Sequence, residues 1–171
     1  SLTGVTEITL LGQNVNSYGR DLTLKLRGAE LTPESSQLVG DKWVEGPHTA
    51  RPLFSDLLCS VAAVSGIRSV RYTSPHPKDF RPETITAMAQ IPEVCEHLHL
   101  PLQSGSDKIL SAMHRGYTAD RYIQKVTAAR DEIPDLALST DIIVGFPGET
   151  DLDFERTLEV AAEVKFDNAY T

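Results

Sequence analysis

The chain has 171 residues, of which 40% are hydrophobic and 23% are charged, and its formal net charge is −8 at pH 7. These values are ordinary for one soluble globular domain, and no apolar stretch approaches the ~20 residues of a membrane span. The acidic balance argues against an autonomous nucleic-acid-binding module, which would carry a basic patch. No basic region precedes an apolar core at the N-terminus, so we expect no membrane association and a cytoplasmic location.

The first third of the chain predicts one strand, one insertion and one helix. Residues 5–11 read as a strand. Residues 20–51 follow no clear period, and because loops of ~30 residues are uncommon in compact domains, we interpret them as an insertion that is mobile in part. Residues 53–64 form an amphipathic pattern typical of a helix. In that helix we expect Cys59 to be a small buried residue.

The rest of the chain alternates strand-like and helical segments. Proline at the first turn and Ser or Thr at the N-cap mark where the helices begin. In chain order we predict a strand at 67–73, a helix at 82–90, a strand at 96–102, helices at 106–114 and 118–132, a strand at 137–144, a helix at 150–164 and a strand from 167 to 171.

This order predicts an α/β fold with a parallel sheet and right-handed crossovers. Leu98 and Leu100 share one face of their strand, while His97 and His99 share the other. A sheet covered by helices on both sides would need two apolar faces. We therefore favour an open, partial TIM-like β/α barrel over a doubly wound sheet, with His99, Gln103 and Asp141 on the concave side.

Three strands end in small polar corners, where a parallel β/α protein gathers its ligand. The first corner is Gly12, Gln13 and Asn14, whose amides could hold a ligand's amine and carboxylate or could form an ordinary Gly-Asn turn. The second begins with Gln103 and Ser104. The Gln103 amide lies in phase with the concave face and could reach a ribose hydroxyl.

The third corner is GFPGET, which begins at Gly145 and Phe146. Gly145 would let backbone approach a flat ring, and the following helix N-terminus could take an anion. An ordinary strand-to-helix turn is the alternative. Arg115 could pair with a carboxylate or complement the C-terminus of its own helix.

Neither a metal site nor a disulfide framework is predicted. Cys59 and Cys95 are 36 positions apart without a CxxC spacing. His97 and His99 form an HxH pair, but no acidic or Cys partner stands at a recognisable spacing. We assign no catalytic residue and no metal ligand in this chain.

Together these corners carry a family resemblance. The strings LLGQNVNSYG, YTSPHP, LHLPLQSGSDKIL and STDIIVGFPGETDLDFE, in this order, resemble the radical S-adenosylmethionine methylthiotransferases, especially the MiaB type that modifies isopentenyladenosine in tRNA. The resemblance covers nearly the whole chain except residues 20–51. It implies S-adenosylmethionine contacts for eight residues. By position these are Gly12, Gln13 and Asn14 at the methionyl amine, Gln103 and Ser104 near the ribose, Arg115 near the carboxylate, and Gly145 with Phe146 along the adenine.

The sequence departs from the family in what precedes the first strand. The family's CxxxCxxC motif binds the radical-generating 4Fe-4S cluster and is not present in these 171 residues. The N-terminal domain that carries a second cluster and the C-terminal RNA-binding domain are not matched either. We therefore expect residues 1–171 to be an internal barrel fragment that is inactive alone.

The resemblance implies a transferase that adds a methylthio group at C2 of N6-isopentenyladenosine by radical chemistry. Its partners would be tRNA, S-adenosylmethionine and a reductant protein. Close alternatives are a methylthiotransferase for threonylcarbamoyladenosine tRNA or for a ribosomal protein. Alternatives of another class are a phosphate-binding β/α barrel that uses Gly148 and Glu149, and a degenerate barrel that serves as a non-catalytic scaffold.

Overall fold

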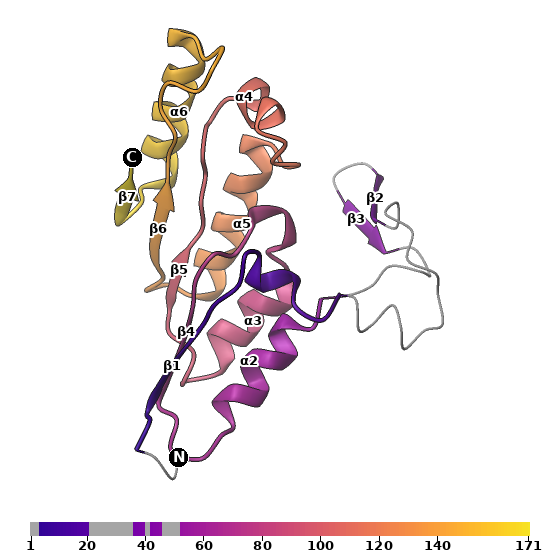
Figure 1. Cartoon of the computed structure of the whole chain (residues 1–171), viewed down its shortest axis with the longest axis vertical. Coiled ribbons are helices and arrows are strands. Elements are labelled where there is room, and N and C mark those ends of the chain that lie inside the picture. The colour runs from indigo at the N-terminus through magenta and orange to yellow at the C-terminus, as the bar shows by residue number, and fades with distance from the viewer. Residues whose placement is uncertain (1–3, 21–35, 40–41, 46–51) are drawn as a thin grey trace.

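The computed structural model describes residues 4–20, 36–39, 42–45 and 52–171 (Figure 1). Its strands are β1 (Glu7–Leu10), β2 (Ser36–Val39), β3 (Lys42–Glu45), β4 (Ser69–Tyr72), β5 (His97–His99), β6 (Ala137–Asp141) and β7 (Asn168–Tyr170). Its helices are η1 (Val15–Ser17), α2 (Phe54–Ala62), η2 (Pro77–Asp79), α3 (Pro82–Gln90), α4 (Asp107–Ala112), α5 (Ala119–Glu132) and α6 (Asp151–Val164).

The five predicted strands form two parallel sheets. In one, β1 pairs with β4, with Glu7 opposite Ser69. In the other, β6 lies between β5 and β7, and all three run parallel. Among the described residues, an isolated bridge between Val70 and Val94 joins the two sheets. The predicted open parallel α/β arrangement is therefore confirmed, and the described strands do not close a barrel.

The helices form a row along one face of these strands (Figure 1). Helix α2 contacts α3, α3 contacts α5, and α5 contacts α6. Leu98 of β5 and Leu138 of β6 are register partners and are fully buried in the core. Tyr122 of α5 is also fully buried, and its hydroxyl donates a hydrogen bond to the Leu100 carbonyl oxygen at 2.6 Å.

The opposite face of the second sheet is polar, as the alternation predicts. His99 lies opposite Ser139, and its Nδ1 is 3.0 Å from the Ser139 hydroxyl. Its Nε2 lies 3.3 Å from Asp141 Oδ2. His97 and His99 line a hollow of about 260 Å³ on this face. Successive side chains of a strand point to opposite faces, so the register that places Leu98 in the core also places both histidines on the open side.

The first third of the chain adds one finding and corrects one prediction. Within the predicted insertion at residues 20–51, β2 and β3 pair in antiparallel register. Apart from these strands and Arg20, that segment lies outside the described residues, and its mobility stays a prediction. The buried role for Cys59 is wrong, because its thiol is exposed. Helix α2 buries Phe54, Leu58 and Ala62, and Cys59 is turned by about 100° from the Leu58 direction.

None of the helices in the described part of the chain is long and apolar enough to cross a membrane.

Candidate functional site

The site begins where β1 and β4 end, because the loops that follow these strands lock together. Asn16, which is 1% exposed, donates from Nδ2 to the His76 carbonyl oxygen at 3.0 Å. The His76 amide returns a hydrogen bond to Asn16 Oδ1 at 2.9 Å. One buried side chain thus pairs with the backbone as a neighbouring strand would, and it holds the two loops in register.

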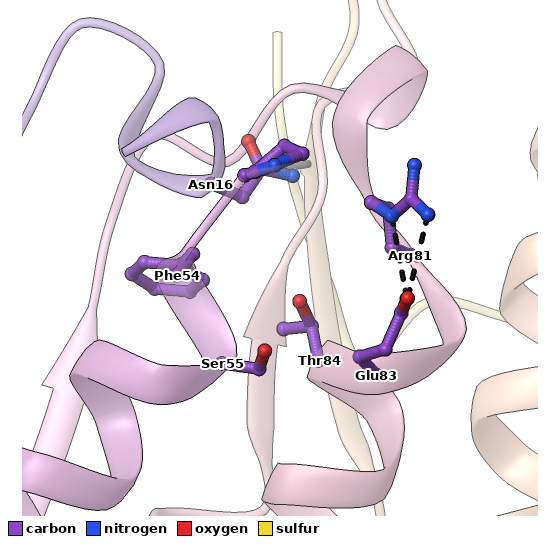
Figure 2. Close-up of a pocket in the computed structure, with 7 residues that line it drawn as sticks. Asn16, Phe54, Ser55, Arg81, Glu83 and Thr84 are labelled. Atoms are coloured by element: carbon purple, nitrogen blue, oxygen red, sulfur yellow. Dashed lines mark hydrogen bonds and ion pairs between the residues drawn. The ribbon is translucent and has the colours of Figure 1, made fainter. Parts of the chain in front are cut away.

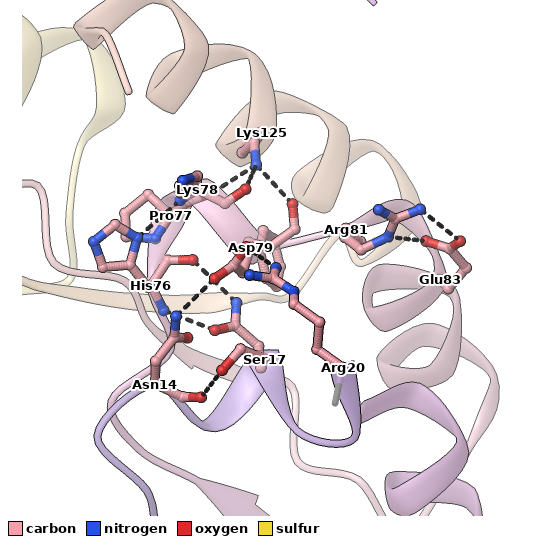
Figure 3. A network of polar contacts seen from close by, with 12 residues as sticks. Asn14, Ser17, Arg20, His76, Pro77, Lys78, Asp79, Arg81, Glu83 and Lys125 are labelled. Carbon is pink, nitrogen blue, oxygen red and sulfur yellow. Dashed lines mark hydrogen bonds and ion pairs between the residues drawn. The ribbon is translucent and has the colours of Figure 1, made fainter. Parts of the chain in front are cut away.

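Asp79 is the hub of the polar network at this corner (Figure 3). It is buried, and its Oδ2 accepts a hydrogen bond from Asn14 Nδ2 at 2.7 Å. Its Oδ1 accepts one from the Arg20 guanidinium, with which it forms an ion pair. Burial alone would raise the pKa of the Asp79 carboxyl, but the hydrogen bonds and charge of Arg20, together with Asn14, lower it below its usual value. Asp79 is therefore an ionised carboxylate at neutral pH.

Lys125 of α5 fixes the backbone around Asp79. Its Nζ donates to the carbonyl oxygens of Pro77 at 2.6 Å, Lys78 at 3.2 Å and Phe80 at 2.8 Å. Burial lowers the pKa of Lys125 to about 8, and three carbonyl acceptors satisfy the three N–H groups of its ammonium. The loop carrying Asp79 is thus anchored to the helix layer as well as to the first corner.

His76 connects this corner to the β5 corner. Its ring stacks edge-on against Tyr117 with centroids 5.6 Å apart. The Tyr117 hydroxyl donates to the Leu102 carbonyl oxygen at 3.0 Å. Burial lowers the pKa of His76; Asp79 opposes this shift, while Arg115 and other nearby cations add to it. Because His76 Nδ1 accepts a hydrogen bond from the Lys78 amide at 3.2 Å, the neutral ring carries its proton on Nε2.

Two buried polar atoms at this corner have no hydrogen-bond partner among the described residues. They are Asn14 Oδ1 and Arg115 Nε. The first is an acceptor and the second is a donor, so one zwitterionic group could satisfy both kinds of atom. Buried polar atoms left in this state are uncommon and point to an unseen ligand or water.

The second corner extends the sheet beyond β5. Gln103 has a left-handed backbone with φ of 66°, and it bridges to Ile142. Ser104 is fully buried, and its hydroxyl lies 3.3 Å from the Thr157 hydroxyl. The ribose contact implied for Ser104 would require this hydroxyl to leave Thr157. Gln103, which is 8% exposed, is the better placed of the two for a ligand.

The third corner presents an open surface. Gly145 has φ of 77°, and a Cβ built there would meet no atom within 4 Å. Its amide donates to Glu149 Oε2, which ties the turn closed, while Glu149 Oε1 is buried without a partner in the described structure. Phe146 is half-buried beside it. A phosphate in this turn would meet the Glu149 carboxylate, so the structure argues against the phosphate-binding alternative.

A crevice between α2 and α3 does not belong to the site. It is bordered by Asn16, Phe54 and the ion pair between Arg81 and Glu83 (Figure 2). Its interior has essentially no enclosed volume. The side chains already fill it, so we assign it no ligand.

The structure joins the predicted residues into two groups. Asn14 and Arg115 belong with the His76 and Asp79 loop, whereas Gln103 lies beside the strand that leads to Gly145. Gly12 and Gln13 precede Asn14 and are exposed at the edge of the first group.

Sequence reasoning missed Asp79, Arg20 and Lys125. The SPHP string indicates a turn before Asp79, but the partners of Asp79, Asn14 and Arg20, are 65 and 59 residues away in the chain. Lys125 is 45 to 48 residues away from the carbonyl groups that it binds. Among the described residues, no group of three His, Cys, Asp or Glu side chains could hold a metal ion.

A comparison with protein families decides the affiliation. The model of the Radical SAM superfamily matches residues 4–161. The chain belongs to the Radical SAM superfamily. The match spans β1, β4, β5 and β6 and all three corners, so the corners described above are parts of one radical SAM domain.

Three curated relatives of this radical SAM domain carry the same name. The chain is 48% identical over 168 residues to the tRNA-2-methylthio-N(6)-dimethylallyladenosine synthase of Moorella thermoacetica. It is 47% and 44% identical to the proteins of that name from Mycobacterium sp. (strain JLS) and Carboxydothermus hydrogenoformans. Each match covers 98% of this chain but only 32%, 30% and 32% of the relative. The chain thus spans about a third of their length, and the resemblance to methylthiotransferases is confirmed.

Proposed function

We propose that this chain is the S-adenosylmethionine-binding part of a tRNA methylthiotransferase that adds a methylthio group at C2 of N6-isopentenyladenosine. The observation that carries the proposal is the 44–48% identity, sustained over 98% of the chain, to relatives named for that reaction. The membership in the Radical SAM superfamily supports the cofactor.

The unpartnered atoms of the corners fit S-adenosylmethionine. Asn14 Oδ1 would accept a hydrogen bond from the methionyl ammonium, and the Arg115 guanidinium would pair with the carboxylate. The open surface at Gly145 and Phe146 would take the flat adenine ring. Gln103, beside the strand that leads to Gly145, would serve the ribose. Gly12 and Gln13 belong to the loop of Asn14, and Ser104 belongs to the loop of Gln103.

The residues of this chain bind and orient rather than transfer protons or electrons. Bound S-adenosylmethionine, with 4Fe-4S clusters held by the intact enzyme, would supply the methyl group and the radical. Arg20, Asp79 and Lys125 fix the first corner before the ligand arrives. Such preorganisation lowers the entropy cost of holding a reactive ligand in one geometry.

The other partners and the location are proposed from the same similarity to the named relatives. We infer that tRNA is the substrate, that a reductant protein delivers electrons, and that the enzyme works in the cytoplasm. Because the net charge of this chain is −8 and tRNA phosphates bind positive groups, we infer that other parts of the enzyme make the main contacts with tRNA.

A chimeric enzyme tests the proposed function. The matching 168 residues of the Moorella thermoacetica relative are replaced by this chain, and the chimera is expressed in a bacterium that lacks its own enzyme. Mass spectrometry of tRNA nucleosides should then detect the 2-methylthio derivative of isopentenyladenosine. A methylthio group on threonylcarbamoyladenosine or on a ribosomal protein instead would assign one of the close alternatives.

Two variants of the chimera test whether the product depends on the surface proposed for adenine. Gly145→Trp fills the surface proposed for adenine and should abolish the product. Leu152→Ala changes an exposed side chain of α6, 65% accessible, and should leave the product unchanged. A folded, cluster-loaded chimera that makes no methylthio product would contradict the proposal.

A further inference from the structure

The amide of Asn14 is oriented by a carboxylate from another loop. Its Nδ2 lies 2.7 Å from Asp79 Oδ2. An ionised carboxylate can only accept hydrogen bonds, so the amide must turn its NH2 group toward Asp79. The pKa of Asp79 is lowered by its partners, which keeps it in that acceptor state at neutral pH. The amide oxygen is thereby directed away from Asp79.

The amide oxygen of Asn14 is available to a ligand. Asn14 Oδ1 is buried and has no hydrogen-bond partner within the described residues. An unpaired buried acceptor destabilises the structure that contains it, so a donor that completes it is bound favourably. The protonated amine of an amino acid is a strong donor of suitable size.

Asp79 is itself held from two directions. Arg20 forms an ion pair with its Oδ1, and Lys125 fixes the carbonyl oxygens of Pro77, Lys78 and Phe80 on either side of it. Asp79 is buried. The carboxylate therefore has little freedom to follow Asn14 if the amide were to rotate.

We propose that Asp79 is a positioning residue that sets Asn14 Oδ1 as the acceptor for the ammonium group of an α-amino-acid ligand. Asp79 would act only through Asn14 and would not touch the ligand. This inference rests on the proposed function, since the ligand class is that of the methionyl group of S-adenosylmethionine. It adds the residue that determines which end of the Asn14 amide the ligand meets.

The first test needs no ligand. In the 171-residue chain, the Nδ2 hydrogens of Asn14 should exchange slowly with solvent in NMR spectra, and Asp79→Asn should remove that protection, since an amide can face Asn14 with either end. Asp167→Asn is the matched control, because Asp167 accepts a hydrogen bond at 2.7 Å from the amide of Leu138, which lies in β6 of the second sheet. Rapid exchange in the wild-type chain would overturn the proposed orientation.

The second test compares two ligands by NMR titration. S-adenosylmethionine has the amine, whereas 5′-methylthioadenosine shares its adenosine and lacks the amino acid. Asp79→Asn should weaken binding of S-adenosylmethionine about tenfold, which corresponds to one hydrogen bond to a charged group, and should change binding of 5′-methylthioadenosine less than twofold. Equal weakening of both ligands would show a merely structural role and would overturn the inference.

A double variant shows whether Asp79 acts through Asn14. Asn14→Ala should cause the same tenfold loss, and adding Asp79→Asn to it should cause no further loss, because residues that act as a unit are not additive. If the double variant binds S-adenosylmethionine more weakly than Asn14→Ala alone, the inference is contradicted. If the wild-type chain binds neither ligand while Asn14 remains protected, the proposed function fails and the ligand assigned here fails with it, but the orientation by Asp79 stands.

Discussion

Replacing Gly105 by alanine should loosen the contact between the second corner and helix α6. Gly105 lies where the backbone of the corner crosses that helix. A Cβ at this position would collide with the carbonyl oxygen of Arg156, and it would lie 2.6 Å from Thr157 Cα. Both obstacles are backbone atoms of a helix, so they cannot rotate away as a flexible side chain could.

The cost can be estimated from two contributions. Overpacking of this kind costs about 1–3 kcal/mol, and rigid backbone obstacles place it at the upper end. If α6 moves away, the bond from the Gly105 amide to Thr157 Oγ1, 2.9 Å long, weakens by about 1 kcal/mol. The sum of about 4 kcal/mol is a large part of the stability of an ordinary domain, and it corresponds to a fall of roughly 10 °C in the melting temperature of a chain this long.

Thermal and urea unfolding, followed by circular dichroism, would measure this effect. Gly12→Ala is the control, because a Cβ there would lie 3.4–3.6 Å from Val15 atoms, an ordinary contact. We expect that variant to stay within about 1 kcal/mol of the parent chain. Hydrogen exchange should locate the damage of Gly105→Ala at the second turn of α6, around Arg156 and Thr157. Equal melting temperatures for the two variants would refute the close-crossing argument.

Three further predictions concern the anchors of the site. Thr150→Ala removes the capping box of α6 and should lower the free energy of unfolding by about 1 kcal/mol, measured by urea unfolding; no change would mean that the cap does not hold the helix. Hydrogen bonds from Lys108, Ser106 and Thr150 lower the pKa of the Asp153 carboxyl, so its stabilisation is present above the unfolded-state pKa of about 4 and is lost as the pH falls further. The melting-temperature difference between the parent chain and Asp153→Asn should therefore shrink from pH 7 to pH 3, and a constant difference would contradict it. Lys125→Met removes the donor to three carbonyl oxygens and should destabilise the chain by roughly 2–3 kcal/mol, with faster amide exchange in η2; unchanged exchange there would refute the anchoring role.

Local patterns predicted the order of elements because the determinants are local. Helix α3 begins at Pro82 and ends at Gln90, as the proline at its first turn indicated. Ser106 and Thr118 cap α4 and α5 through side-chain hydrogen bonds. The strands are shorter than predicted: β6 ends at Asp141 rather than at residue 144, because ladder pairing rather than hydrophobicity determines where a strand ends.

The pairings between distant loops could not be predicted in the same way. Asn14 and Asp79 are 65 residues apart, and Arg20 is 59 residues from Asp79. Periodicity places a polar residue on a face or in a corner, but it does not state which carboxylate comes from the next loop. The exposure of Cys59 has a related cause, since one helical step decides between the core and solvent.

The arrangement at the first corner shows why the unpaired atoms are more informative than the paired ones. Arg20, Asp79 and Lys125 satisfy one another or the backbone, and so they form a scaffold. Asn14 Oδ1 and Arg115 Nε remain outside those pairings although they are buried. A sequence pattern identifies residues able to form hydrogen bonds, whereas a structure shows which atoms the fold has already used. At this corner, the two buried atoms of the described residues that it has not used are an acceptor, Asn14 Oδ1, and a donor, Arg115 Nε. This pair is the complement of an ammonium and a carboxylate on one ligand.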